Sequence, residues 1–349
     1  MSANLAAVAA ALVVAVSCNA QVYFRRVAEP REKAFTILVP AGWRTEGGIV
    51  RVNPMAANGP ANAIAAKVDF AVKRDAAGSV MLRALPEMMY ADLRRTPVGG
   101  TGMFPVGSQY NGMTVYPVTD AATFLAQVAF KYAHPRATAA RVADRRQNSR
   151  LAQAYAQRLR ASGVPFQFRY DAAVLTVNYQ EGGAAYTEKL FTAIEDMGQA
   201  GGGIWSNKDT VLVRAPAGEF EKWAPILSIV QSSVQMNPQW VAGEIRGQMQ
   251  RNKIALDVQR DIQRIDREIV AHRQRTDAEI NNDMFLTLTG QEEYINPHTN
   301  QVEMGSNQWK YRWVTPSGDV VYSDDSSYDP NHDPNLNRTD FKRTPVRPR

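Results

Sequence analysis

Residues 166–183 read FQFRYDAAVLTVNYQEGG, and this stretch decides the fold class. Large apolar side chains alternate with other residues along it: Phe166, Phe168, Tyr170, Leu175, Val177 and Tyr179. A period of two is typical of a strand with one buried face. The Glu-Gly-Gly run at 181–183 predicts a turn, because glycine tolerates the backbone angles that turns require. The stretch therefore predicts strands of an antiparallel sheet, followed after the turn by a strand or a helix over 185–196.

Flanking segments extend this sheet and add helices to it. Residues 35–39 and 68–72 alternate in the same way and predict further strands. Helices are expected over 121–133, where Thr119 or Asp120 is the cap, over the Arg-rich stretch 136–161, and over the amphipathic stretch 217–234. Together these segments predict an α+β body over residues 35–236, an antiparallel sheet with packed helices.

The C-terminal third predicts a long helix and then a small β-meander. Asn237-Pro238 starts a charged helix over 237–282, because Asn caps free N–H groups and Pro suits the first helical position. A heptad seam runs along it, through Val258, Ile262, Ile265, Ile269 and His272. This 258–272 seam predicts pairing with another copy or with another protein, or else docking on the chain's own body. Turn signals predict a β-meander over 283–328, and the Pro- and Asn-rich residues 329–349 an extended tail.

The N-terminus predicts export. Residues 5–16 are uniformly apolar, a length that fits a signal peptide over 1–20 and is too short to span a bilayer. Cys18, the only cysteine, ends a segment similar to a lipobox and is the candidate lipidation site; cleavage after Ala20 is the alternative. The polar residues 21–34 then predict a tether. The expected location is extracytoplasmic, either in the periplasm or as a membrane-anchored lipoprotein.

Positive charge is concentrated in one stretch. Residues 136–160 contain seven arginines and a single acidic residue, so they carry the whole net charge of +6. Arg141, Arg145 and Arg146 are therefore candidate contacts for an anionic membrane surface or an acidic envelope protein. The alternative is a solvated helix face. Nucleic acid is not an expected partner of an exported protein.

The C-terminal region carries two further candidate sites. Trp309, Tyr311 and Trp313 alternate, which predicts either a stacking platform for a ligand or the core of a small sheet. Oxygen-bearing residues then occupy the ligand places of a calcium loop: Asp329, Asn331, Asp333, Asn335, Asn337 and Asp340. Pro334 stands where such a loop needs Gly, so a run of turns is the alternative. No cofactor besides Ca²⁺ is expected.

Enzyme motifs are absent from the sequence. The four histidines form no metal-ligand spacing, and no nucleophile elbow occurs. The leading hypothesis is an exported, non-catalytic binding or scaffold protein of the cell envelope. The alternative is an envelope hydrolase that uses paired carboxylates near the aromatic strand, with these candidates: Glu292, Glu293, Asp324 and Asp325.

Two strings resemble a known family. FTILVPAGW at 35–43 is similar to the opening strand of PsbP-like proteins, and the helix at 217–234, with its Ile-Leu-Ser-Ile-Val run, is similar to their closing helix. The resemblance covers about 30 residues and implies an exported α/β sandwich that binds, without catalysis, at a membrane-associated complex. The Arg-rich stretch would then be an insertion.

Overall fold

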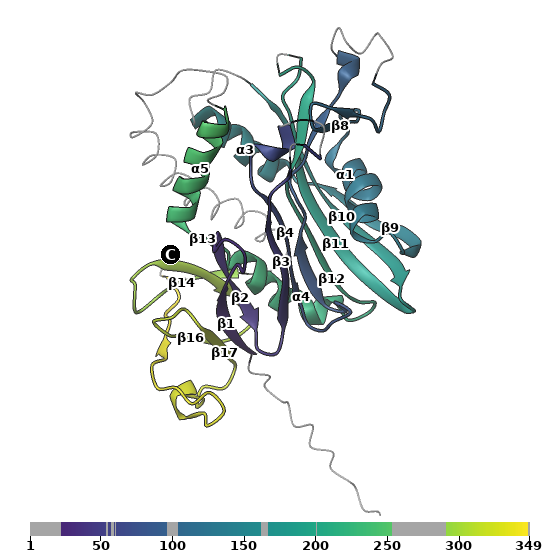
Figure 1. The fold of residues 1–349 in the computed structure, drawn as a ribbon. Coiled ribbons are helices and arrows are strands. Elements are labelled where there is room, and N and C mark those ends of the chain that lie inside the picture. Colours follow the sequence, from purple (N-terminus) through teal and green to yellow (C-terminus); the bar gives the residue numbers. More distant parts are fainter. Residues whose placement is uncertain are drawn as a thin grey trace, which may run out of the picture.

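The computed structural model describes residues 22–53, 55–56, 59, 61–95, 104–161, 167–199, 201–252 and 291–347. This part of the chain forms a large, mostly antiparallel sheet, a smaller antiparallel sheet and the helices that cover them (Figure 1). The predicted α+β class with antiparallel strands is confirmed at this level. The signal segment, Cys18 and the 258–272 seam lie outside the described residues.

The large sheet forms the centre of the molecule. Its main path runs in the order β3 (Arg44–Val50), β4 (Lys67–Lys73), β5 (Met81–Ala84), β12 (Ile204–Pro216), β11 (Ala184–Asp196), β10 (Arg169–Glu181) and β9 (Thr138–Gln147). Three short strands extend it, β6 (Met89–Ala91), β7 (Gln109–Tyr110) and β8 (Met113–Val115). Gly182 and Gly183 have φ of 59° and 81° and join β10 to β11 in the predicted turn.

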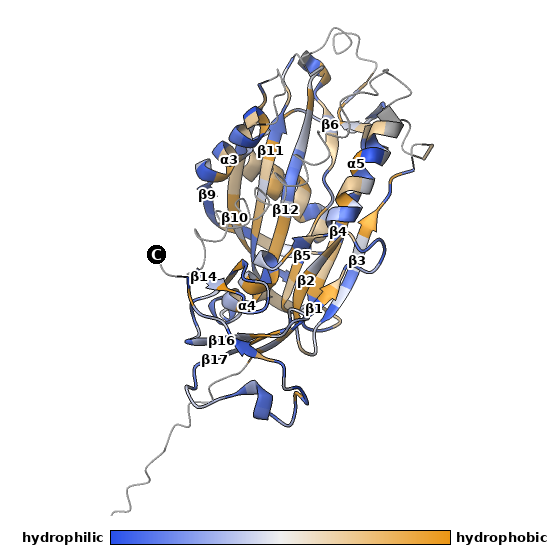
Figure 2. Ribbon diagram, turned by 90° about the vertical axis from the view of Figure 1, so that its left-hand side faces the viewer, coloured by the Kyte–Doolittle hydropathy of each residue, from blue (hydrophilic) through white to orange (hydrophobic). Residues whose placement is uncertain are grey.

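Helices and the smaller sheet cover the two faces of this sheet. A continuous helical segment, α1 (Ala121–Phe124), η4 (Leu125–Ala129) and α2 (Phe130–Ala133), packs on one face. The other face packs against α3 (Ser149–Ala161), α4 (Phe220–Ser232) and the smaller sheet. Figure 2 shows hydrophobic residues on the inner strands and hydrophilic residues on β9 at the edge. Burial of this apolar surface is the main stabilising term of the fold.

The smaller sheet joins the N-terminal and C-terminal strands. Its order is β13 (Gln235–Met236), β2 (Phe35–Pro40), β1 (Val22–Ala28), β17 (Val320–Ser323), β16 (Tyr311–Val314) and β18 (Lys342–Arg343). The prediction of a tether was therefore wrong for residues 22–28. They form a strand that pairs with β2 and β17, and Phe24 is fully buried.

The predicted meander is also replaced by a different arrangement. β14 (Gln291–Ile295) and β15 (Val302–Ser306) form a separate hairpin, whereas β16 and β17 form a hairpin within the smaller sheet. The predicted meander order fails because β17 pairs with β1. The tail packs against this region, where η5 (Pro330–His332) precedes β18 and Phe341 is buried.

The Arg-rich stretch is not a single helix. Its first half is β9, which pairs with β10, and its second half is α3. Asn148 separates the two, because its amide donates to Ala172 of β10 and its side chain accepts from the Leu151 amide in the first turn of α3. The prediction of a helix over 136–161 is therefore correct only for Ser149–Ala161.

The helix predicted after Asn237 begins as expected. Asn237 Oδ1 accepts from the amides of Gln239 and Trp240, and α5 (Pro238–Asn252) follows. The rest of the predicted 237–282 helix lies outside the described residues. The remaining short helical turns are η1 (Ala61–Ala63) and η2 (Leu93–Arg95). In the described part of the chain, no helix has both the length and the apolar character to cross a membrane.

Candidate protein-binding site

Strand β9 is an exposed edge of the large sheet. It pairs with β10 along one side, and no described residue pairs with its other side. All of its residues are exposed except Asp144, which is half-buried, and 54% of the surface of Val142 is accessible to solvent. An unpaired edge presents backbone donors and acceptors in a row, which is the template that an added strand recognises.

The backbone groups that point outward follow from the pairing register. The Asn148 amide donates to the Ala172 carbonyl at 2.8 Å, so this pair is a hydrogen-bonded one. Such pairs alternate along an antiparallel ladder with pairs whose N–H and C=O groups point away from the partner. The register is regular from Asp144 to Gln147, so Arg145 and Gln147 direct their backbone groups outward.

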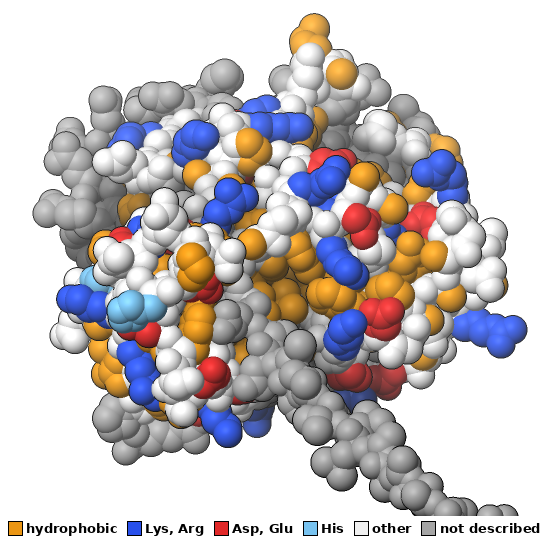
Figure 3. All heavy atoms as spheres, turned by 90° about the horizontal axis from the view of Figure 1, so that it is seen from below, with side chains coloured by type: hydrophobic (Ala, Val, Ile, Leu, Met, Phe, Trp, Pro, Cys, Tyr) orange, Lys and Arg blue, Asp and Glu red, His pale blue; other side chains and the backbone are white. Residues whose placement is uncertain are grey.

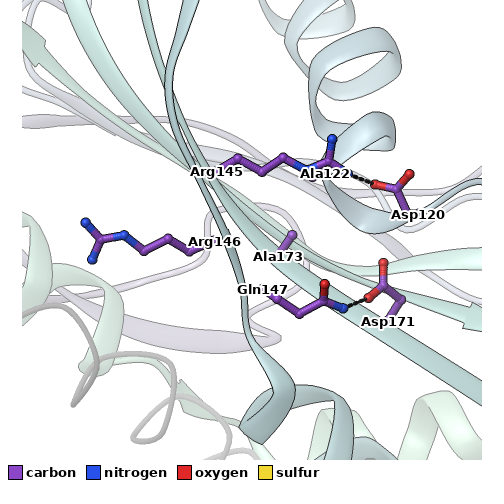
Figure 4. A pocket seen from close by; sticks show the side chains of 7 residues that line it. All are labelled: Asp120, Ala122, Arg145, Arg146, Gln147, Asp171 and Ala173. Carbon is purple, nitrogen blue, oxygen red and sulfur yellow. Dashed lines mark hydrogen bonds and ion pairs between the residues drawn. The ribbon is translucent and has the colours of Figure 1, made fainter.

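The arginines of β9 lie on both sides of the sheet edge. Figure 4 shows Arg145 extending toward Asp120 while Arg146 points the other way. Arg145 Nη2 lies 2.6 Å from Asp120 Oδ1, and Arg146 Nε lies 2.6 Å from Asp144 Oδ2. The side chains of Arg145 and Arg146 are 56% and 70% exposed. Arg141 is exposed and makes no ion pair within the described residues.

A small cavity of about 170 Å³ lies between β9 and the start of α1. It is lined by Asp120, Ala122, Arg145, Arg146, Gln147, Asp171 and Ala173 (Figure 4). Ligand pockets of enzymes usually measure about 300–1,000 Å³. The cavity is therefore too small to enclose an ordinary substrate.

Both carboxylates of this cavity already serve the fold. Asp120 caps α1 by accepting from the Thr123 amide at 2.9 Å, and Asp171 accepts from the Ala121 amide at 2.7 Å and from the Gln147 side chain. Burial would raise the pKa of Asp120, but hydrogen bonds from Thr123 and the charge of Arg145 outweigh it and lower the pKa. These aspartates fix the position of β9 against α1.

The aromatic residues of the C-terminal region do not form one platform. Tyr311 and Trp313 share a face of β16, whereas Trp309 precedes the strand and packs against Tyr322 in the main core, with ring centroids 5.4 Å apart. Trp313 is only 7% exposed, and the Arg343 guanidinium lies 4.2 Å from the centre of the Tyr311 ring. The tail covers these rings, which favours the core interpretation.

The residues of the predicted calcium loop make local contacts. Asp329 caps η5, Asp333 accepts from the Asn335 amide at 2.9 Å, and Asp340 pairs with Arg338 at 2.6 Å. Asn331 bonds both backbone groups of Phe341, and among the described residues no three His, Cys, Asp or Glu side chains are placed to share a metal ion. The geometry supports the alternative of turns, which these residue types favour.

The carboxylates considered for hydrolysis do not meet at the cavity. Glu292 and Glu293 lie on β14, where Glu293 pairs with Arg347 at 3.0 Å. Asp324 accepts from the Lys310 amide, and Asp325 accepts from Ser327. None of the four lines the cavity beside β9. A glycosidase mechanism needs two carboxyl groups facing one cleft.

A buried charged cluster was not predicted from the sequence. His134 Nε2 lies 2.9 Å from Glu188 Oε2, and the Nδ1 atom of the same ring lies 3.1 Å from Glu181 Oε2. Arg214 donates to Glu181 at 2.8 Å and to Tyr179 at 3.1 Å. Burial would raise the pKa of Glu181, but the charges and hydrogen bonds of Arg214 and His134 lower it.

This cluster holds the end of α2 against β10, β11 and β12. His134 is 3% exposed and Glu188 is fully buried, so an external substrate has no direct access to either side chain. The sequence offered one indication of this cluster, the position of His134 at the end of the predicted helix, directly before Pro135. Its partners come from strands that pair only after folding.

A hollow on the lower face is a second surface feature. Figure 3 shows hydrophobic side chains within it, with basic and acidic side chains both present around its rim. Mixed charge at a rim gives little discrimination between acidic and basic partners. The surface of β9 differs, because arginine dominates there.

Comparison with solved structures shows only a weak structural likeness. No family model and no curated protein matches the sequence. Among the solved structures that match is cyanobacterial PsbP from Synechocystis sp. PCC 6803, at 11% identity and a TM-score of 0.27. The match covers 62% of this chain and 93% of that one.

Proposed function

We propose that this protein is an exported, non-catalytic binding or scaffold protein that binds an acidic partner protein through β9. The observation that carries the proposal is an exposed edge strand that bears Arg141, Arg145 and Arg146 and has no described strand on its outer side. Basic surfaces of this kind raise the rate and selectivity of association with acidic partners.

The existing ion pairs of β9 offer little resistance to a partner. The pairs of Arg145 with Asp120 and of Arg146 with Asp144 are all at least 42% exposed. Exposed ion pairs contribute about 0–1 kcal/mol each, because water and salt screen them. Carboxylates of a partner can therefore replace these contacts at small cost.

A protein partner fits this geometry better than a membrane surface. Arg145 and Arg146 point to opposite sides of the sheet edge, so they cannot both lie flat on one lipid plane (Figure 4). A partner chain that lies along the edge can contact both. It can also supply hydrogen-bond partners for the outward backbone groups, which lipid tails cannot do.

Export and anchoring rest on the sequence. The apolar residues 5–16 and Cys18 support a secreted protein or a lipoprotein, and the PsbP-like strings at 35–43 and 217–234 support an exported protein that binds at a complex. Incorporation of radiolabelled palmitate into wild type and into Cys18→Ala decides between the two forms. Label in wild type that is lost in the variant supports the lipoprotein; label in neither supports plain secretion.

The binding proposal is tested with labelled poly-L-glutamate and fluorescence anisotropy. The double variant Arg141→Gln/Arg146→Gln is expected to bind at least about fivefold more weakly, with a shallower salt dependence. The matched control Lys222→Gln/Lys310→Gln removes two exposed positive charges elsewhere and should stay within about twofold of wild type.

Two results would contradict the proposal. Equal weakening in the test and control variants would mean that net charge alone drives binding. Arginine-dependent binding to phosphatidylglycerol vesicles, without binding to poly-L-glutamate, would replace the acidic protein with a membrane surface.

A further inference from the structure

We infer that β9 accepts an added strand: an acidic, extended segment of the partner protein pairs with the backbone of residues 144–148. This inference rests on the proposed function and specifies how the same surface recognises its partner. The argument compares the two ends of the large sheet, then uses the outward backbone groups of β9, and then its charge.

The opposite end of the sheet is protected against strand addition. At β3, the Ile49 amide donates to the buried Glu29 carboxylate at 2.9 Å, and Arg31 donates to the Ile49 carbonyl at 3.0 Å. Gly47 and Gly48 have φ of 85° and 145°, so the backbone of β3 departs locally from ordinary strand angles, although its pairing with β4 is unbroken. Covered and irregular edges of this kind are how proteins avoid unwanted pairing. Along β9, no described residue supplies a comparable cover over its regular half.

The regular half of β9 has the geometry that an added strand needs. Its pairing with β10 is unbroken from Asp144 to Gln147, and Asn148 continues it. The outward N–H and C=O groups of Arg145 and Gln147 offer two donors and two acceptors. Before Asp144 the register shifts, and Ala139 has φ of 51°, so regular pairing ends there.

Charge determines which strand can pair. A second copy of β9 would bring arginines opposite one another, which is destabilising in cross-strand pairs. An acidic strand instead places carboxylates beside Arg145 and Arg146, and opposite charges in cross-strand pairs are stabilising. The exposed Val142 adds apolar contact next to this segment. The favoured occupant is therefore an acidic partner strand and not a second copy of this chain.

The probe is a short, end-capped peptide of alternating Glu and Val, and the control is the same peptide with every backbone amide methylated. Both peptides carry the same charge, but the methylated one donates no backbone hydrogen bonds. We expect the unmodified peptide to bind the full chain and the methylated peptide to bind at least about tenfold more weakly, because one hydrogen bond of about 1.4 kcal/mol changes affinity tenfold.

A matched pair of variants tests the edge itself. Gln147→Ala and Gln147→Pro both remove the side-chain contact with Asp171, but only proline also removes the outward N–H. Proline is tolerated where a strand N–H points to solvent, so both variants should fold. Gln147→Ala is expected to bind the peptide within about twofold of wild type, and Gln147→Pro about tenfold more weakly.

Amide hydrogen exchange of the wild type gives an independent readout that requires no variant. Peptide binding should slow exchange at Arg145 and Gln147, whose amides point outward, and leave Arg146, which is already paired with β10, unchanged. This measurement decides the question if the proline variant does not fold.

The outcomes separate this inference from the proposed function. Equal binding by Gln147→Pro and Gln147→Ala, with unchanged exchange at residues 145 and 147, would overturn strand addition. If Arg141→Gln/Arg146→Gln still weakened binding in that case, the basic surface would remain the binding site. Failure of the arginine variant to alter binding would overturn the proposed function, and with it the acidic character of the added strand.

Discussion

Replacing Glu29 is expected to destabilise the protein more than any surface charge does. The residue follows β1, and its side chain is fully buried. Its carboxylate accepts four backbone hydrogen bonds, from Arg31 at 2.9 Å, Glu32 at 2.8 Å, Ala34 at 3.4 Å and Ile49 at 2.9 Å. One side chain therefore fixes the turn into β2 and covers the edge of β3.

The magnitude follows from the groups that lose their acceptor. A hydrogen bond to a charged group contributes about 1.5–3 kcal/mol, and an orphaned buried donor costs about 1–3 kcal/mol. These terms are not additive within one network, so Glu29→Ala should lower the free energy of unfolding by about 4–6 kcal/mol. Glu29→Gln keeps one acceptor oxygen but places an NH₂ group against backbone N–H donors. It should lower the free energy of unfolding by about 2–4 kcal/mol.

Urea unfolding followed by tryptophan fluorescence measures these differences. Glu46→Gln is the matched control, because the side chain of Glu46 is 66% exposed and pairs with Lys73 at the surface of β3. The control should change the free energy of unfolding by less than about 1 kcal/mol. The reasoning is refuted if Glu29→Gln lowers the free energy of unfolding by no more than this control does. The comparison holds when the slope of that free energy against urea concentration is unchanged in both variants.

Acidic pH should remove part of the difference in the free energy of unfolding between wild type and Glu29→Gln. Burial would raise the pKa of Glu29, but the backbone hydrogen bonds outweigh it and hold the pKa below its ordinary value of 4.5. The unfolded chain therefore protonates Glu29 at a higher pH than the folded chain does. The contribution of the Glu29 carboxylate to the free energy of unfolding is complete at pH values above the unfolded-state pKa. It is lost as the pH falls through the folded-state pKa. Urea unfolding at neutral and at acidic pH should therefore give free energies of unfolding for the two proteins that lie closer together at acidic pH.

Three further changes test other contacts. Glu303→Gln leaves Arg312, which is 2% exposed, without its partner at 2.5 Å, so urea unfolding should show a loss of about 3–5 kcal/mol. Gly305→Ala would place a Cβ atom 2.7 Å from the Tyr294 ring. The free energy of unfolding should therefore fall by about 1–3 kcal/mol, which a lower melting temperature would show. Asp120→Ala removes the cap of α1 and should cost about 1 kcal/mol by urea unfolding. A smaller cost for Glu303→Gln than for Asp120→Ala would contradict the ranking by burial.

Local patterns in the sequence were sufficient to predict one turn and the starts of two helices. The turn between β10 and β11 was predicted because two adjacent glycines permit positive φ, which the structure uses at Gly182 and Gly183. Asp120 was one of two predicted caps, and Asn237 was the predicted start of α5. Each of these features depends on residues within one turn of the chain, so the local pattern contains the information.

The strand β1 could not be predicted in the same way. Its sequence, VYFRRVA, contains adjacent arginines and shows no clean alternation. It becomes a strand because it pairs with β17, which lies about 300 residues later, as in the pair Tyr23 and Val321. Tertiary pairing overrides a weak local preference. For the same reason, the buried role of Glu29 could not be found from its polar neighbours.

The Arg-rich stretch shows the same limit at the candidate site. Ala and Arg are strong helix formers, so composition predicts a helix over 136–161. The segment from Thr138 to Gln147 instead completes a sheet, because β10 offers an edge with which its backbone can pair. Only Ser149–Ala161, which buries Leu151 and Tyr155, follows the predicted preference.

This difference changes what the arginines can do. On a solvated helix, the backbone is fully bonded, and arginine side chains offer charge alone. On an edge strand, the same residues combine charge with unpaired N–H and C=O groups, so recognition can depend on the shape of the partner's backbone as well as on its charge. The two properties respond to different changes: salt and Arg146→Gln act on the charge, and Gln147→Pro acts on the backbone. A partner that tolerates salt but not Gln147→Pro would be held mainly by strand pairing, and the opposite response would identify a charged surface that only happens to lie on a strand.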